Sequence, residues 1–247
     1  MLRFPSVTQL TPEFLTFGLI WYLVFLFSTT CHEASHALAA KLGGDPTASR
    51  GGQVTLNPAP HVTREPFGMV VLPILSYLIG GGMIGWASAP YDPYWQQRYP
   101  RRAALMSLAG PGANFALAIL AAVAIHVGIS AGIFQAPAVA SFQRVTEVVN
   151  PETASDPMRF AASILSVLFF ENILLGTFNL LPMPPLDGGT GITILMSERA
   201  ALRFLAFIRQ PGFQMMGMVA AWLLFDKLFD PIFTVALNLL YPGSHYG

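Results

Sequence analysis

The chain has 247 residues, of which 53% are hydrophobic and only 11% are charged, and its formal net charge is zero. Ordinary globular domains carry about 25% charged residues, so this composition argues against a soluble protein. No basic stretch is long enough to attract nucleic acid, and we expect no nucleic-acid partner. The single cysteine, Cys31, excludes an intrachain disulfide.

Four strongly apolar segments follow one another along the chain, at roughly 14–40, 103–127, 159–178 and 213–240. Each is long enough to supply the roughly 20 helical residues that cross a hydrocarbon core. A fifth apolar segment, 67–89, is rich in Gly and Pro. In lipid, such helix breakers are tolerated only where protein or water satisfies the freed backbone groups.

Two further segments have distinctive patterns. Residues 52–56 alternate apolar and polar side chains, which predicts a short strand. Residues 192–209 alternate apolar residues with Glu and Arg, which predicts an amphipathic helix at the membrane interface. The fold class expected is an all-α polytopic membrane protein. It has about four full transmembrane helices, a re-entrant segment and a short membrane-associated β element.

We expect a single integral-membrane domain over residues 1–247. Its catalytic core covers about 14–190, and 191–247 supplies the interfacial helix and the last transmembrane segment. No stretch has the size and polarity of an appended soluble domain.

The first apolar segment ends in His32-Glu33-Ala34-Ser35-His36, which fits H-E-x-x-H. On a helix, His32 and His36 lie on one face one turn apart, where two imidazoles can bind one Zn²⁺. Glu33 can then act as the base that takes a proton from water. Such a motif can also arise by chance, but ionisable residues in an apolar helix are costly and therefore functional candidates.

A catalytic zinc site needs a third protein ligand. The best candidate is Asp187, which follows a proline-rich turn after the 159–178 segment and precedes two glycines. An ordinary polar turn is the simpler alternative, since Asp-Gly-Gly is common in loops. Glu171 and Asp226, which also lie in apolar surroundings, remain rivals for the ligand role.

Several motifs in this order resemble the site-2 protease family of intramembrane zinc metalloproteases. They are His32-Glu33-x-x-His36, Gly110-Pro111-Gly112-Ala113-Asn114, and Asn179 followed by Leu186-Asp187-Gly188. The compact subgroup without accessory domains is the most similar, through Thr55-Leu56-Asn57-Pro58 with His61 and through Gly85-Trp86-Ala87.

This resemblance implies Zn²⁺ as the cofactor, Asp187 as the third ligand, and Asn179 as a catalytic residue that positions substrate or stabilises an oxyanion. Two further residues are candidates for substrate positioning. For Asn114, a helix-cap or helix-packing role is as frequent as a role in the site. For a lone loop histidine such as His61, an ordinary surface position is more frequent than a role in the site.

The ligands must meet at one membrane depth, so an even number of crossings separates His36 from Asp187. The segment 67–89 is therefore better explained as re-entrant than as spanning, although 128–142 could instead supply a further crossing. With 67–89 re-entrant, nine basic residues lie on the zinc side and three on the other, so the zinc lies near the cytoplasmic face.

We therefore expect an integral membrane protein, in a prokaryotic cell membrane, that hydrolyses peptide bonds in or near transmembrane segments of membrane proteins. Its partners are these substrates and the lipid bilayer. A non-catalytic homologue that binds membrane proteins is one alternative, and a metal-ion carrier is another.

Overall fold

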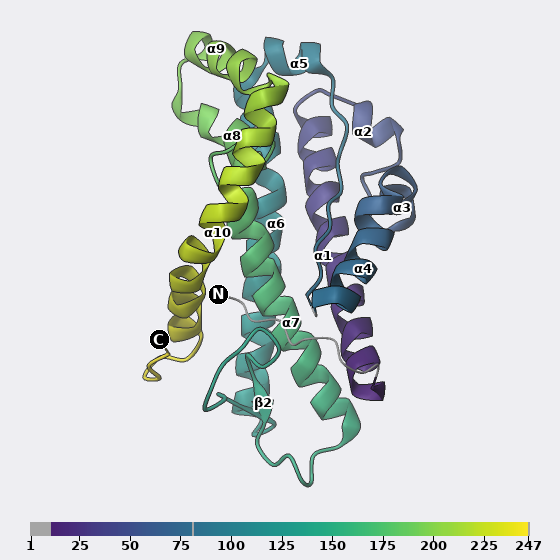
Figure 1. Cartoon of the computed structure of the whole chain (residues 1–247), viewed down its shortest axis with the longest axis vertical. Coiled ribbons are helices and arrows are strands. Elements are labelled where there is room, and N and C mark those ends of the chain that lie inside the picture. Colours follow the sequence, from purple (N-terminus) through teal and green to yellow (C-terminus); the bar gives the residue numbers. More distant parts are fainter. Residues whose placement is uncertain (1–10, 81, 247) are drawn as a thin grey trace.

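The computed structural model describes residues 11–80 and 82–246, apart from the side chain at position 226. Four long helices dominate it: α1 (Pro12–Leu42), α6 (Pro100–Ser130), α7 (Asp156–Asn179) and α10 (Pro211–Leu240). Helices α1, α6 and α7 pack against one another, and α10 packs against α7. Figure 1 shows these helices running side by side along the long axis of the molecule.

The start of α1 illustrates why the helices begin where they do. The Thr11 hydroxyl accepts a hydrogen bond from the backbone N–H of Phe14, and Pro12 occupies the first turn. A hydroxyl cap and an early proline are favoured at helix N-termini because the first N–H groups have no helical partner. Gly43 ends the helix.

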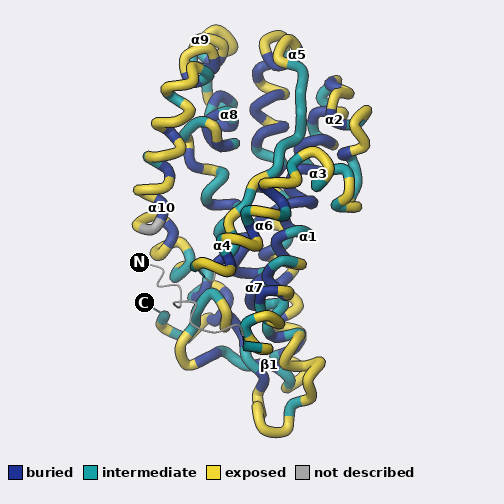
Figure 2. Tube along the Cα trace, turned by 45° about the vertical axis from the view of Figure 1, so that its right-hand side comes forward, coloured by how far each residue is buried: buried dark blue, intermediate teal, exposed yellow. Residues whose placement is uncertain are grey.

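Helices α1, α6 and α7 are long and apolar enough to cross a membrane. Three of the four predicted spans are thereby confirmed as candidates. Helix α10 has 30 residues and begins with the apolar stretch Pro211–Phe225. Many large apolar side chains on the long helices are exposed, and a hydrocarbon solvent suits such a surface. Figure 2 shows exposed positions, in yellow, along the outer faces of these helices.

Residues 67–80 and 82–92 form the two arms of a hairpin between the short helices α2 (Thr47–Arg50) and α3 (Ala59–Arg64) and helix α5 (Pro93–Arg98). A π-helical turn η1 (Phe67–Val71) and α4 (Leu72–Gly80) lead away from α3, and an extended segment, 82–92, returns to α5. The two arms are joined where Trp86 N–H donates to the Gly68 carbonyl at 3.1 Å. Figure 1 places α2 and α5 at the same end of the molecule, as the re-entrant interpretation requires.

The predicted strand at 52–56 is wrong, because these residues form turns. The Thr55 hydroxyl accepts from Asn57 N–H, and the Asn57 side chain accepts from Ala59 N–H. Side chains that bond their own backbone in this way compete with strand pairing.

The small sheet lies instead in the loop between α6 and α7. It pairs β1 (Phe134–Gln135) with β2 (Glu147–Val148) in antiparallel register. No helix occupies 131–155, so the alternative crossing at 128–142 is also wrong.

After α7 the chain forms α8 (Asp187–Gly191), the 3₁₀ turn η2 (Ile192–Leu195) and α9 (Glu198–Ile208). The amphipathic helix predicted over 192–209 is therefore shorter and separated from η2 by a break. Its amphipathic character is confirmed, since Ala201, Leu205 and Ile208 are buried. Figure 1 shows α8 and α9 at the same end of the molecule as α2 and α5. The segments that carry His36 and Asp187 therefore lie toward the same end.

Candidate metal centre

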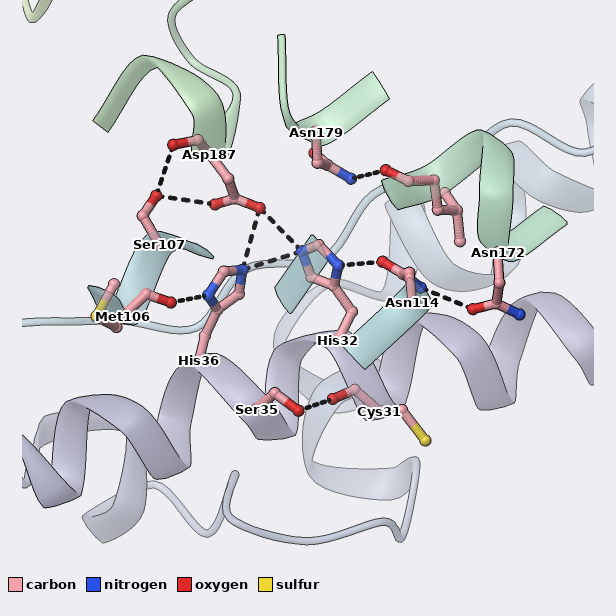
Figure 3. A network of polar contacts seen from close by, with 11 residues as sticks. Cys31, His32, Ser35, His36, Met106, Ser107, Asn114, Asn172, Asn179 and Asp187 are labelled. Atoms are coloured by element: carbon pink, nitrogen blue, oxygen red, sulfur yellow. Dashed lines mark hydrogen bonds and ion pairs between the residues drawn. The ribbon is translucent and has the colours of Figure 1, made fainter. Parts of the chain in front are cut away.

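Three side chains that the sequence singled out converge between α1 and α8. His32 and His36 lie one turn apart on α1, and Asp187 is the first residue of α8. Their candidate ligand atoms all lie within 4.8 Å of one another. The Nε2 atoms of the histidines are 2.9 Å apart, and Asp187 Oδ2 lies 3.0 Å from His32 and 3.2 Å from His36 (Figure 3).

Asp187 is held in place by the turn that follows α7. A Cβ at Gly188 would lie 2.2 Å from the Leu180 carbonyl oxygen, so only glycine allows the turn to fold this closely. On α6, the Ser107 hydroxyl donates to the Asp187 main-chain carbonyl at 2.8 Å and lies 3.3 Å from Oδ1. Oδ2 is thereby left facing the two histidines.

The proton positions on His36 follow from its partner. Its Nδ1 lies 2.7 Å from the Met106 main-chain carbonyl, which can only accept a hydrogen bond. Nδ1 therefore carries the proton, and in the neutral ring Nε2 offers a lone pair to a metal.

The tautomer of His32 is fixed by a longer chain of hydrogen bonds. Its Nδ1 lies 2.6 Å from Asn114 Oδ1, and Asn114 donates to Asn172 Oδ1 at 2.9 Å. Asn172 in turn donates to the Leu168 carbonyl and to Ser28 Oγ, both at 2.9 Å. Because the Leu168 carbonyl can only accept, it orients both amides in sequence and makes His32 Nδ1 the donor. The Nε2 of His32 is then free to bind a metal.

These donors fit a zinc ion. A tetrahedral ion with ligands at about 2.0–2.1 Å holds neighbouring donors about 3.3 Å apart. The observed separations of 2.9–3.2 Å are close to this value. A Cβ at Gly110 would meet the Nε2 atoms of His36 and His32 at 2.3 and 2.5 Å, so this glycine leaves the imidazoles room against α6. Ser107, Gly110 and Asn114 are spaced to share one face of that helix.

Glu33 lies beside the ligands on α1 and is only 5% exposed. Its Oε2 has no hydrogen-bond partner among the residues that the structure describes. An unpaired buried carboxylate oxygen is costly and needs an explanation. A water at the metal would supply the missing partner. Cys31 is buried with a free thiol and does not belong to the ligand group.

The electrostatics favour an ionised Asp187. Burial raises the pKa of this carboxyl, but the charge and hydrogen bonds of His36 and His32, which act when these rings are protonated, outweigh burial and hold the pKa well below its usual range. At neutral pH the carboxylate is therefore available to a cation.

The remaining candidates lie outside the ligand group. Asn179 ends α7 and its amide donates to the Leu175 carbonyl of its own helix at 3.0 Å, as Figure 3 shows. His61 is buried on α3, so its surface alternative is wrong, and its Nε2 lies 3.2 Å from the Thr55 carbonyl. Asn114 lies inside α6, which excludes the helix-cap alternative.

Of the rival ligands, Glu171 is buried on α7 and is absent from the ligand group, whereas the side chain of Asp226 lies outside the described part. Some residues of the site were not predicted from the sequence: Ser107, Met106 and Asn172, and also Gly110 in its packing role. A polar residue in an apolar helix was the available signal for Asn172 and Ser107. The carbonyl of Met106 gives no signal in the sequence.

A helix-borne histidine pair, an aspartate from a following turn and a buried glutamate together define a zinc metalloprotease site in an integral membrane protein. The comparison with known families agrees. Residues 20–224 match the family model of Peptidase family M50, so the chain belongs to this family, which is the site-2 protease family.

Curated relatives are similar over most of the chain. The Bacillus subtilis (strain 168) protein "Putative zinc metalloprotease YwhC" is 30% identical over 202 residues, which cover 77% of this chain and 80% of the relative. "Putative zinc metalloprotease Rip2" of Mycolicibacterium smegmatis is 30% identical over 189 residues, covering 76% of this chain and 61% of the relative. No solved structure gave a significant match.

Proposed function

We propose that this protein is an intramembrane metalloprotease that hydrolyses peptide bonds in or near the transmembrane segments of membrane proteins. The observation that carries the proposal is the burial of a complete set of metal donors, with an unpaired glutamate, among long apolar helices. A substrate that reaches such a site comes from within the bilayer.

In this proposal His32, His36 and Asp187 hold Zn²⁺. When bound, zinc polarises a carbonyl and lowers the pKa of water toward about 7. Glu33 takes the proton from the attacking water and returns it to the nitrogen of the leaving amine, so that one water and one peptide bond give a carboxylate and an amine. Asn179 positions the substrate or donates to the developing oxyanion.

Asn114 and Asn172 orient His32 through their hydrogen bonds, and Met106 orients His36. The substrate-positioning roles predicted for Asn114 and His61 stay proposals. The substrate must unwind locally, because a helix shields its own carbonyls. We further propose that the metal centre lies near the cytoplasmic face, on the side of α2, α5 and α9.

The decisive experiment compares the wild type with Glu33→Gln. Both purified proteins should hold about one zinc per chain, since Glu33 is not among the three ligand residues. Cleavage of a model transmembrane peptide in proteoliposomes should fall by about 10²–10⁴-fold in the variant, the usual effect of removing a general base. Metal content and mass-spectrometric product analysis measure the two quantities.

Glu13→Gln is the matched control, because Glu13 lies exposed in the first turn of the same helix. It should retain both zinc and cleavage. Undiminished cleavage by Glu33→Gln would refute the proposed base. Zinc without cleavage in the wild type, across a panel of transmembrane peptides, would instead favour the non-catalytic alternative.

A further inference from the structure

A second feature of the membrane region is a cavity of about 260 Å³ bordered by α1, the extended segment 82–85, α7 and α10. Its wall is mostly apolar and strongly aromatic, with Trp21, Phe25, Phe178 and Trp222 among its members. It contains none of the three metal-ligand residues, so it is a separate space.

Two polar atoms interrupt this apolar wall. Trp21 and Glu171 are 4% and 3% exposed, and both line the cavity. Trp21 Nε1 and Glu171 Oε2 have no hydrogen-bond partner within the described ranges 11–80 and 82–246. Buried polar groups are normally paired, because an unpaired one loses its hydration without compensation. The cavity is therefore bordered by two residues that each carry a buried polar atom, an N–H donor and a carboxyl oxygen, without a partner of complementary chemistry.

The cavity also has exposed residues at its border. Trp222 on α10 is 60% exposed, and Ile84 on the extended segment is 42% exposed. Both are large apolar side chains on the outer surface of a membrane protein, where lipid is the solvent. An occupant can therefore enter from the bilayer, between α10 and the hairpin.

Its place along the helices relates the cavity to the metal centre. Trp21 and Phe25 precede His32 by eleven and seven residues on α1, which corresponds to about 16 and 10 Å of helix rise. On α7, Phe178 directly precedes Asn179. An extended chain rises about 3.3 Å per residue. A substrate strand that passes the metal centre would therefore bring a side chain three to five residues away to this cavity.

We propose that this cavity is a substrate subsite that binds a neutral side chain able both to donate and to accept a hydrogen bond, three to five residues from the hydrolysed bond. The proposal rests on the proposed function. A phenol or amide group carries both complementary functions, an oxygen that can accept from Trp21 Nε1–H and an O–H or N–H that can donate to Glu171 Oε2. A lipid acyl chain would fill the space but satisfy neither atom.

The test uses a transmembrane peptide that the wild type cleaves, with the cleaved bond located by mass spectrometry. Tyr and Phe are placed in turn at positions two to six residues from that bond, on both sides. At one of the predicted positions the Tyr peptide should have a kcat/KM about tenfold or more above the Phe peptide, since a site built to hydrogen-bond a hydroxyl rejects its analogue. Glu171→Leu should abolish this preference, so that the ratio of the kcat/KM values of the Tyr and Phe peptides falls to about one.

Glu171→Gln is the matched variant, because it keeps an acceptor and should retain a preference for Tyr. Trp21→Phe removes the N–H donor together with one of the two indole rings, and it should reduce the preference. Equal cleavage of Tyr and Phe peptides at every position, or a Tyr preference that survives Glu171→Leu, would overturn the subsite.

Binding separates failure of the subsite from failure of the proteolytic function. Glu33→Gln protein should bind the Tyr peptide about tenfold more tightly than the Phe peptide, and the added Glu171→Leu change should remove the difference. If the wild type cleaves no peptide, the proposed function fails, and this measurement still decides whether the cavity recognises the hydroxyl. If both peptides bind equally tightly and a fluorescent fatty acid displaces both equally, the cavity is a lipid site and the proposed subsite is wrong.

Discussion

At the scale of single residues, the metal centre depends on side chains that never contact the metal. His32 is oriented by Asn114, which is oriented by Asn172, which is fixed by the Leu168 carbonyl of its own helix. Partners of this kind raise the basicity of a histidine ligand and hold its ring at the correct angle. Three helices, α1, α6 and α7, thus contribute to the position of one imidazole.

We predict that Asn114→Leu lowers the affinity for zinc by about 10–100-fold, the usual effect of removing such a partner. Asn172→Leu should weaken zinc binding by a smaller factor, because Asn114 then loses its orientation but keeps its acceptor oxygen. Chelator competition on the purified protein measures both affinities.

Asn179→Leu is the control for zinc affinity, since this asparagine lies two turns further along α7 and donates only to its own helix. Its affinity for zinc should match the wild type. If Asn114→Leu also binds zinc as the wild type does, the hydrogen-bond chain has no part in holding the metal.

The sequence predicted His32, Glu33 and His36 because their relation is local and depends only on helix geometry. Asp187 was the best third-ligand candidate from its proline-rich turn, but only the family resemblance chose it over its rivals, since it lies 151 residues beyond His36 in sequence. Asn172 was not found, because its role arises only when three helices pack.

At the scale of elements, the hairpin of residues 67–92 depends on close backbone contact. A Cβ at Gly68 would lie 2.3 Å from the Trp86 carbonyl oxygen, and one at Gly85 would lie 2.4 Å from the Gly68 carbonyl oxygen. Tyr77 anchors α4 to α1 by donating to the Phe14 carbonyl at 2.7 Å. The glycines that made this segment look irregular are therefore the residues that allow its arms to approach.

We predict that Gly68→Ala destabilises the protein by roughly 1–3 kcal/mol, as overpacking does elsewhere. The extended arm should also become more sensitive to limited proteolysis. Thermal unfolding in detergent and digestion kinetics measure these effects.

Gly80→Ala is the matched control in the same arm, since a Cβ there has nothing within 4 Å. It should leave stability unchanged or slightly higher, because alanine favours the helix. Equal behaviour of the two variants would mean that the close contact at Gly68 is unimportant.

The elements also show where pattern reasoning fails. Apolar length and periodicity located the long helices within about three residues at each end. Alternation at 52–56 misled, because two turns that use Thr55 and Asn57 side chains produce the same pattern as a strand. The short sheet after α6 was missed, since two-residue strands carry too little pattern to detect.

At the scale of the whole molecule, the path of the hairpin determines which segments of the chain lie on the same side as the metal centre. Because residues 82–92 return to the end of the molecule where α5 lies, this end gathers α2, α5, α8 and α9 (Figure 1). The nine basic residues expected on the zinc side lie in these elements or beside them: Lys41, Arg50, Arg64, Arg98, Arg101, Arg102, Arg199, Arg203 and Arg209. Of the three basic residues expected on the opposite side, Arg144 lies in the loop between α6 and α7, Arg159 lies in the first turn of α7, and Arg3 lies outside the described residues. Basic residues favour the cytoplasmic side, which supports the proposed orientation.

Single-cysteine labelling tests this orientation, because Cys31→Ser removes the one native cysteine. Cysteines replace Leu56, Tyr94, Leu195 and Val139 in turn, which are 63%, 80%, 85% and 66% exposed. In intact bacterial cells, a membrane-impermeant maleimide should label position 139 and spare 56, 94 and 195. Inverted membrane vesicles should give the reverse pattern, and zinc content confirms that each variant is folded. Labelling of 94 and 195 in intact cells, with 56 and 139 protected, would instead mean that 67–89 crosses the membrane. The metal ligands would then be separated by an odd number of crossings, which their meeting within 4.8 Å forbids.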